Sequence, residues 1–432
     1  MIDRRYDSWR SSTTRPAALR SGPTLSVVSL LAPFRALRPP PERASDVAEL
    51  PYDVMNRAEA RAMAAGRPWS FLHVSRPDID LPDDVAADSP DGLALAEAAF
   101  ARLQENAVLV RDSAPSLYAY RLSVDDHRQT GVVGVAEVAA YHDGRIRRHE
   151  LTTAAKQADR AAHMVAIGAQ TGPVFAVHRP SATIGSVLDD VTRSRAETSV
   201  EGPGGTRHEL WPIADATVQQ KLVEGFDDLA GLYIADGHHR SAAAADVNAR
   251  LGIPSSAVFL TVAFPADEVQ VLPYNRLLRT PPGMSAAELL DGVRRGFSVE
   301  AVARAVTPTA RGEIGLYLSG QWYRLVVPQT DGGGADPVAG LDAAVLQSRL
   351  IGPVLGVDNP RTAPNVGFVG GNRPVSDLAE AVDSGEWTAA VSLHATTVDD
   401  LMAVADAGAV MPPKSTWFEP KLLDGLVSHV LD

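Results

Sequence analysis

The sequence of 432 residues predicts an α+β protein in which mixed sheets pack against helices. Stretches that alternate apolar and polar residues, typical of strands, recur along much of the chain. Amphipathic or alanine-rich stretches, typical of helices, lie between them without the strict rhythm of a parallel βαβ protein. Hydrophobic residues make up 45% of the chain, which is enough for a sizeable core. The sequence shows no internal repeat.

The first 115 residues are predicted to form a tail and an N-terminal α/β region. Residues 1–23 are polar, rich in arginine and aperiodic, which is typical of a flexible tail or of a chain start assigned too early. Residues 24–115 open with an apolar stretch, 25–31, that we expect to be the first core strand. Two helices are expected to follow, at 57–65 and at 86–105.

Residues 116–300 are predicted to form the core. Residues 116–141 alternate apolar and polar around the segment DDHRQTG, which predicts a β-hairpin. A helix is expected from an N-cap at Thr152 or Thr153 to about Gln170. The other expected elements are a strand that ends at 178, a loop at 198–208, a strand at 231–235, a helix at 241–250, a strand at 257–264, and alternating patterns at 269–278 and 286–297.

Residues 301–432 are predicted to form a C-terminal α/β subdomain. The stretch GEIGLYLSGQWYRLVV indicates a second hairpin, which turns at Ser319-Gly320. Strand and helix patterns then alternate through 341–350, 388–393 and 398–407.

Composition and charge argue against several classes of function. The chain has no cysteine, which excludes disulfides, thiolate nucleophiles, zinc–thiolate sites and iron–sulfur clusters, and fits a cytoplasmic location. The net charge of −13 disfavours binding along a nucleic acid. No apolar run approaches the ~20 residues of a membrane span. The basic residues are nearly all arginine, and the lysines are Lys156, Lys221, Lys414 and Lys421.

The most informative motif is DGHHR, residues 236–240, followed by Ser241 and an alanine-rich stretch. A hydrophobic strand ends at Asp236, Gly237 permits a tight turn, and a helix follows at once. The free N–H groups and positive dipole of a helix N-terminus attract anions, and two histidines and an arginine add donors for phosphate. A metal site built on the two histidines is the alternative, and a plain turn with a paired Asp–His is the third interpretation.

Two further motifs carry charged or hydroxyl groups. In RRHELTT, Glu150 follows His149 and two arginines near a predicted helix start, which suits a general base or metal ligand, but equally an acid that complements the helix dipole. In MPPKSTWF, Lys414 precedes Ser415 and Thr416, which suits contact with phosphate. Gly408 lies six residues before that lysine, as in a P-loop, but Pro413 replaces the required glycine and a helix precedes it, so we reject a P-loop.

Other candidates are weaker. Pro51-Tyr52-Asp53 and the stretch 367–373 (GFVGGNR) are lesser candidates for ligand contact, and a hairpin turn explains the glycine pair 370–371 equally well. Trp211 is expected in the core. Four histidines are assigned structural roles, namely His73, His163, His178 and His394.

Together DGHHR, RHE and PKST resemble the archaeal free-serine kinase and its long bacterial relatives, many of which are described only as a domain of unknown function. The long bacterial pattern is similar through residues 33–432, including PFRALRP, LPYDV and MPPKSTWFEPKL. The resemblance implies the fold shared by ParB partition proteins and sulfiredoxin, and transfer of a phosphoryl group from a nucleotide to free L-serine with Mg²⁺. Residues 24–115 have no counterpart in the shorter kinase.

The resemblance also implies roles for particular residues. Glu150 corresponds to the base for the serine hydroxyl, with His149 beside it, and Asp236 to a second catalytic carboxylate. Trp417 and Phe418 stand where the kinase has Arg-His, which leaves the identity of the acceptor and of the donor nucleotide open. We expect Trp417 and His149 to contact the substrate. The residues implied to bind nucleotide phosphates are Gly237, His238, His239, Arg240, Ser241, Lys414, Ser415 and Thr416.

The sequence therefore predicts a small-molecule kinase that uses ATP or ADP with Mg²⁺ and acts on free L-serine or a similar hydroxy amino acid. We expect no nucleic-acid or membrane partner and leave a homodimer open. The alternatives are a nucleotide-hydrolysing protein of the same fold and a nucleotide-gated binding protein of the ParB type, although the sequence has no basic helix-turn-helix region. Sulfiredoxin chemistry requires a cysteine and is excluded.

Overall fold

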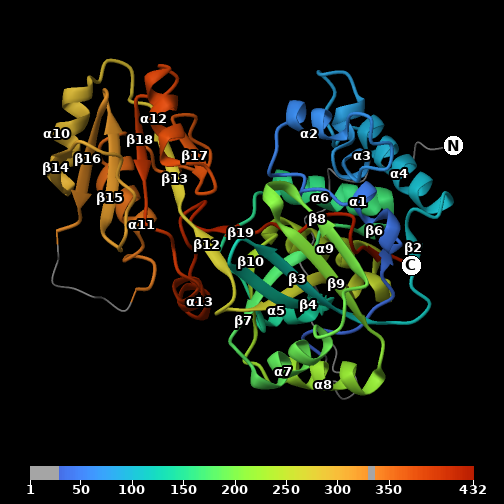
Figure 1. Ribbon diagram of the computed structural model, residues 1–432. Coiled ribbons are helices and arrows are strands. Elements are labelled where there is room, and N and C mark those ends of the chain that lie inside the picture. The colour runs from blue at the N-terminus through green and yellow to red at the C-terminus, as the bar shows by residue number, and fades with distance from the viewer. Residues whose placement is uncertain (1–28, 329–335) are drawn as a thin grey trace, which may run out of the picture.

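The computed structural model describes residues 29–328 and 336–432, which form two lobes, each built on a sheet (Figure 1). It confirms the predicted α+β class. The predicted tail, 1–23, and most of the predicted first strand lie outside the described residues. Leu30 and Leu31 are buried but are not in a strand, and sheet bonding begins with a bridge from Ala32 to Val135.

The first lobe contains an eight-stranded mixed sheet in the order β5-β10-β7-β11-β4-β3-β9-β8. The predicted hairpin at 116–141 is present, although its last residues form a helix, α5. The prediction of a loop at 198–208 is wrong, because strands β8 and β9 flank a short glycine-rich turn there. The strands are β3 Leu117–Val124, β4 His127–Glu137, β5 Ile146–Arg147, β7 Val174–His178, β8 Thr198–Glu201, β9 Arg207–Ile213, β10 Leu232–Asp236 and β11 Val258–Pro265.

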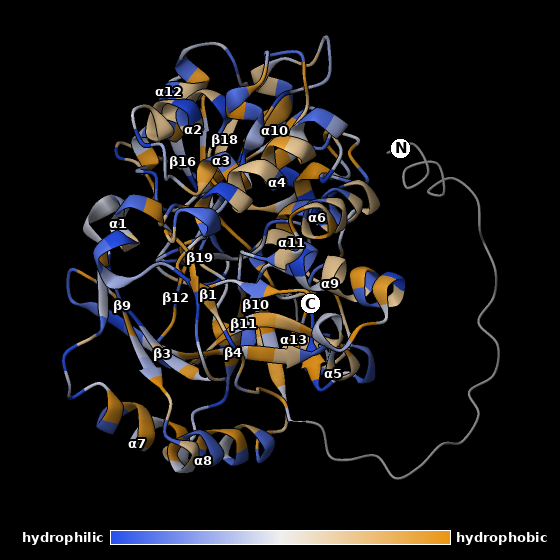
Figure 2. Ribbon diagram, turned by 90° about the vertical axis from the view of Figure 1, so that its right-hand side faces the viewer, coloured by the Kyte–Doolittle hydropathy of each residue, from blue (hydrophilic) through white to orange (hydrophobic). Residues whose placement is uncertain are grey.

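Both faces of this sheet are covered by other parts of the chain. Successive side chains of a strand point to opposite sides, so one strand can contribute to the cores on both faces. On β3, Leu117 and Ala119 contact the core beneath the helices α5–α9, while Tyr118 and Tyr120 contact a second core beneath α1, α13 and the C-terminal segment. Strand β11 and the second half of β4, which pair in the middle of the sheet, are accordingly largely hydrophobic (Figure 2). The helices are α1 Ala44–Val47, α5 Val138–Asp143, α6 Ala154–Ile167, α7 Ala182–Val191, α8 Ala216–Asp227, α9 His238–Leu251 and α13 Val398–Asp406.

Two helices differ from the predicted bounds for local reasons. The helix predicted to run to Gln170 ends at Ile167, because Gly168 adopts a left-handed conformation and the next two residues form strand β6, Ala169–Gln170. Its N-cap, Thr153, makes no side-chain capping bond. The helix predicted from residue 241 begins at His238, directly after Gly237.

The described N-terminal region is mainly helical and packs against α6. The helix predicted at 86–105 begins at Pro90, because Ser89 caps it by accepting a hydrogen bond from the N–H of Gly92 at 3.1 Å. The elements are β1 Leu37–Arg38, α2 Arg57–Ala64, α3 Leu72–Ser75, α4 Pro90–Glu105 and β2 Val110–Arg111.

The second lobe contains a six-stranded sheet in the order β14-β16-β15-β18-β13-β17. The predicted hairpin turns at Ser319-Gly320, both with positive φ. Strands β13 and β14 begin before residue 300, so this sheet includes residues on both sides of the boundary expected there. The elements are β13 Tyr274–Leu278, α10 Ala286–Gly296, β14 Ser298–Val302, β15 Glu313–Leu318, β16 Gln321–Val326, α11 Asp342–Leu346, β17 Val366–Gly370, α12 Val375–Asp383 and β18 Ala389–Ser392.

After β18 the chain returns to the first lobe. Helix α13 lies against β10, strand β19 (Trp417–Glu419) pairs with β12 (Gln270–Leu272), and strand β20 (His429–Val430) pairs with β6. This return brings residues beyond 410 beside the first sheet. Among the described residues, no helix has the length and apolar character needed to cross a membrane.

Candidate functional site

Two of the three motifs lie together because they follow neighbouring parallel strands. β5 and β10 pair in parallel, with Ile146 opposite Leu232. Parallel strands run in the same direction, so the chain leaves both at the same edge of the sheet. The RHE motif follows β5 and DGHHR closes β10, which brings residues 149–150 beside residues 236–240.

Asp236 is held at the end of β10 by three donors. Its carboxylate accepts the N–H of Gly237 at 2.7 Å and pairs with Lys421 Nζ at 3.1 Å and with the Arg240 guanidinium at 3.7 Å. Burial alone would raise the pKa of Asp236, but Lys421 and Arg240 hold it well below its usual range. Gly237 has φ +91°, so the tight turn that the sequence predicts is present. Asp236 is therefore an ionised carboxylate at neutral pH.

The third motif reaches the same place along the returning C-terminal segment. The N–H of Met411 donates to the carbonyl of His149 at 2.8 Å. Arg276, on β13, donates to the carbonyls of Pro413 and Lys414 at 3.1 and 3.0 Å. Lys414 adopts a left-handed backbone conformation, with φ +58°. The loop is thus fixed between the two lobes, in a conformation that an unsupported lysine rarely adopts.

Lys414 points toward acidic and aromatic groups of the site. Its Nζ lies 5.7 Å from the centre of the Tyr274 ring. Desolvation lowers the pKa of Lys414, but Tyr274, Glu150, Asp53 and Asp236 outweigh it and raise the pKa. The lysine is accordingly charged at neutral pH.

These groups line one small cavity of about 80 Å³. Of the residues that the sequence singles out, Glu150, Asp236, His238, Lys414, Thr416 and Trp417 line it. His149 lies beside it, with its ring packed against that of His238 and its Nε2 3.4 Å from Thr416 Oγ1. Asp53, a lesser candidate in the sequence, also lines the cavity.

Five of the predicted phosphate-binding residues lie outside the lining. Gly237 forms the turn, with its N–H bonded to Asp236, and the side chains of the other four have partners within the protein. Each of these four was singled out because its residue type suits phosphate, but its side chain is hydrogen-bonded to another group of the protein. The bonds join the N–H of Thr153 to His239 Nε2 (3.2 Å), the Arg240 guanidinium to the Pro173 carbonyl, the Ser241 hydroxyl to the His238 carbonyl (3.0 Å) and the Ser415 hydroxyl to the Pro412 carbonyl (2.7 Å).

Sequence reasoning missed four residues that shape the site. Arg361 pairs with Glu150 at 3.3 Å, Lys421 pairs with Asp236, Tyr274 lines the cavity, and Arg276 holds the lysine loop. The scarcity of lysine could have indicated Lys421. The other three lie in the second lobe, far along the chain from any motif, and carry no local pattern that points to them.

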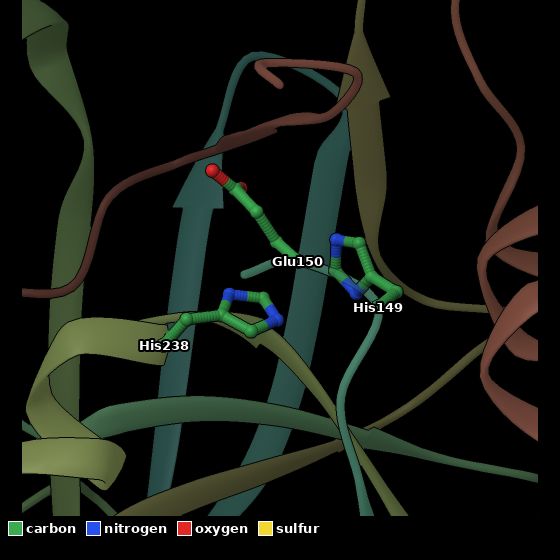
Figure 3. Close-up of side chains that lie close together, drawn as sticks. All are labelled: His149, Glu150 and His238. Carbon is green, nitrogen blue, oxygen red and sulfur yellow. The ribbon is translucent and has the colours of Figure 1, made fainter. Parts of the chain in front are cut away.

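His149, Glu150 and His238 form a compact group at the cavity (Figure 3). The two rings are perpendicular, with centres 4.5 Å apart, and the potential ligand atoms of the three residues lie within 4.8 Å of one another. Burial lowers the pKa of both His149 and His238 to about 3, so both imidazoles are neutral at pH 7. This is the one group of histidine and carboxylate side chains in the described residues with the spacing of a metal site.

The small cavity adjoins a groove of about 860 Å³, which shares Tyr274, Trp417 and Lys421 with it. Both lobes line this groove, and Phe368 and Arg373 from the stretch 367–373 belong to it. A volume of this size is typical of sites for small molecules and cofactors.

Comparisons with known proteins give the following likenesses. A family model described as "Protein of unknown function (DUF1015)" matches residues 31–344. A free serine kinase in complex with AMP is 15% identical, with a TM-score of 0.37, over 69% of this chain and 92% of that chain. A conserved hypothetical protein from Pyrococcus furiosus is 15% identical, with a TM-score of 0.36, over 68% and 93%. SbnI with C-terminal truncation, from Staphylococcus aureus, is 11% identical, with a TM-score of 0.38, over 69% and 87%.

No curated protein matches the chain. The expected relation to a family of unknown function and the expected likeness to free serine kinase are confirmed. The ParB/sulfiredoxin-like label of the fold stays a prediction.

Proposed function

The chain belongs to the DUF1015 family, and we propose that it is a small-molecule kinase that transfers a phosphoryl group from ATP or ADP to the hydroxyl of free L-serine or a similar hydroxy amino acid. One observation carries the proposal. Three motifs that are far apart in the sequence contribute Glu150, Asp236, Lys414 and Thr416 to a single cavity. This combination suits phosphoryl transfer, which depends on positioning and on neutralising charge more than on covalent chemistry.

The cations of the site would stabilise the phosphates. Lys414 and Lys421 line the small cavity, and Lys421 also lines the adjoining groove. The N-terminus of α9, which begins at His238, adds backbone N–H groups and the positive end of a helix dipole. In this proposal the nucleoside lies in the groove and the phosphates extend past Lys421 to Lys414.

Glu150 would accept the proton of the acceptor hydroxyl. The hydroxyl oxygen attacks the terminal phosphorus as its proton passes to Glu150, and the bond from phosphorus to the leaving nucleotide oxygen breaks with its electron pair. Arg361, 3.3 Å from one carboxylate oxygen, orients Glu150. Trp417, held by a bond from its indole N–H to Glu419 at 2.8 Å, forms an apolar wall beside the acceptor.

The carboxylates of the cavity fit the Mg²⁺ that the resemblance implies. Mg²⁺ takes oxygen ligands and is usually held by one or two carboxylates together with substrate phosphates. Asp53 lines the cavity and would supply such an oxygen, whereas both oxygens of Asp236 already accept bonds from Gly237 and Lys421. When bound, the ion would neutralise charge on the phosphates.

A mass-spectrometric assay tests the proposal. The purified chain is incubated with Mg²⁺, ATP or ADP, and L-serine, D-serine, threonine or homoserine, and we expect a phosphorylated amino acid. Glu150→Gln should lose about 10²–10⁴-fold in turnover, the usual contribution of a general base, and should still bind nucleotide. Glu105→Gln, an exposed glutamate at the end of α4, is the matched control.

Two outcomes would refute this assignment. Nucleotide hydrolysis without a phosphorylated acceptor would favour a nucleotide hydrolase. Full activity of Glu150→Gln would show that another group accepts the proton.

A further inference from the structure

We infer that His149, Glu150 and His238 form a binding site for a divalent transition-metal ion, for which Zn²⁺ is the best fit. The ligand atoms of the three residues lie within 4.8 Å of one another, and they come from two segments that the parallel pair β5 and β10 places side by side (Figure 3). The site is separate in its chemistry from any Mg²⁺ that accompanies a nucleotide.

The donor set selects the class of metal. Two imidazoles and one carboxylate are ligands found in zinc sites that keep one position open for water or substrate. Imidazole nitrogen suits Zn²⁺ and its neighbours in the first transition row, whereas Mg²⁺ requires oxygen. Of the three donors only Glu150 offers oxygen, so the set does not suit Mg²⁺.

The state of the two histidines is a second, independent observation. His149 is 1% exposed and His238 is 7% exposed. Nδ1 of His149 and Nε2 of His238 have no hydrogen-bond partner in the part of the chain that the structure describes. A buried polar atom without a partner costs about 1–3 kcal/mol, and most such atoms in folded proteins are paired. A bound metal would give one of these nitrogens a partner.

The geometry requires only a modest closing of the three side chains. Tetrahedral ligands about 2.1 Å from zinc are roughly 3.4 Å from one another, which is shorter than the 4.8 Å limit observed here. Glu150 can supply the movement, because its side chain is 19% exposed and its segment lies between β5 and α6. Its bond to Arg361 uses Oε1, which leaves Oε2 for the metal.

One consequence rests on the proposed function. Glu150 cannot ligate a metal and accept a proton through the same electron pair, so Zn²⁺ bound here should inhibit phosphoryl transfer. Metal binding itself is measured without nucleotide or acceptor. Failure of the kinase proposal would therefore leave the binding result intact, and failure of binding would leave the kinase assay intact.

The test uses the full chain without a histidine tag, because a tag would bind the same metals. After treatment with a chelator, the protein is titrated with Zn²⁺ by calorimetry and with Co²⁺ by visible absorption. We expect one equivalent of either ion and a strong Co²⁺ band typical of low coordination number. His238→Gln and Glu150→Gln should weaken binding by more than the ~10–100-fold that loss of a supporting outer contact costs.

His142→Gln is the matched control, because His142 is exposed on α5 and should not alter the affinity. Circular dichroism checks that each variant is folded. If His238→Gln does not fold, Glu150→Gln removes a ligand from a less buried position and provides the same test. Absence of binding, or equal binding by wild type and by Glu150→Gln, would overturn the inference.

Discussion

Arg276 is expected to determine how firmly the Lys414 loop is held. The residue is 3% exposed, and its guanidinium makes four bonds to backbone carbonyls, those of Tyr274 (2.7 Å), Asn275 (3.3 Å), Pro413 (3.1 Å) and Lys414 (3.0 Å). Burial lowers the pKa of Arg276 to about 10, so the group is still charged at pH 7. Replacement by methionine keeps most of the volume and removes every donor.

The size of the effect follows from the two bonds that reach the loop. A hydrogen bond from a charged donor contributes about 1.5–3 kcal/mol, so two contribute about 3 kcal/mol at the lower limit. Each 1.36 kcal/mol corresponds to about tenfold in rate, so Arg276→Met should lower kcat/KM by about 10²-fold. Arg276→Lys keeps a charge but not the planar fork of donors. Its kcat/KM should therefore lie between those of wild type and Arg276→Met.

Hydrogen exchange gives a measurement that does not depend on the reaction. Backbone N–H groups of residues 414–417 should exchange faster in Arg276→Met than in wild type, under conditions in which both are folded. Arg279→Met is the control, because Arg279 lies on the same stretch of chain and is exposed. Its guanidinium carbon lies 4.1 Å from the centre of the Trp387 ring. Unchanged exchange in the loop of folded Arg276→Met would refute the reasoning, whatever the activity.

Two further predictions concern charge and pH. Asp236 has a pKa below its usual range, so its ion pairs stabilise the fold above about pH 4 and lose this effect as the pH falls. Lys421→Met should therefore be less stable than wild type at pH 7, and denaturant unfolding should show the difference shrinking below about pH 4. Burial raises the pKa of Asp424 to about 7, so this group weakens the fold as the pH rises from about 4 through 7. Asp424→Asn should show a flatter dependence of melting temperature on pH, and parallel curves for the two proteins would contradict the assignment.

The local parts of the site could be predicted from sequence. A hydrophobic strand, a glycine and an alanine-rich helix in succession specify the turn at Gly237, and the structure has that turn. The hairpin of β3 and β4 follows equally from its alternating pattern. The glycine-rich stretch 202–205 led to the wrong prediction of a loop at 198–208. The turn that it forms joins two strands, β8 and β9, in which the alternation of apolar and polar residues is short.

The sequence could not show which side chains enter the cavity. Arg240, Ser241 and Ser415 have the residue types that suit phosphate, yet each bonds to a carbonyl of the protein. Ser241 and Ser415 bond to carbonyls three residues before them, whereas the partner of Arg240, Pro173, is set only by the packing of the folded chain. Lys421, in contrast, lines the cavity although the sequence did not indicate it. Its ion pair with Asp236 exists because the C-terminal segment returns to the first sheet after crossing the second lobe, and no local pattern specifies such a path.

The second lobe is part of the site although it carries none of the three motifs. Arg276 holds the Lys414 loop, Tyr274 forms a wall of the cavity, and Arg361 contacts both the carboxylate of Glu150 and the carbonyl of Leu151. A shift of this lobe relative to the first would therefore move a cation away from Glu150 and break the bonds from Arg276 to the lysine loop in one motion. Since the groove between the lobes adjoins the cavity, a ligand bound in it would contact both lobes and favour the arrangement in which lysine and carboxylate face each other.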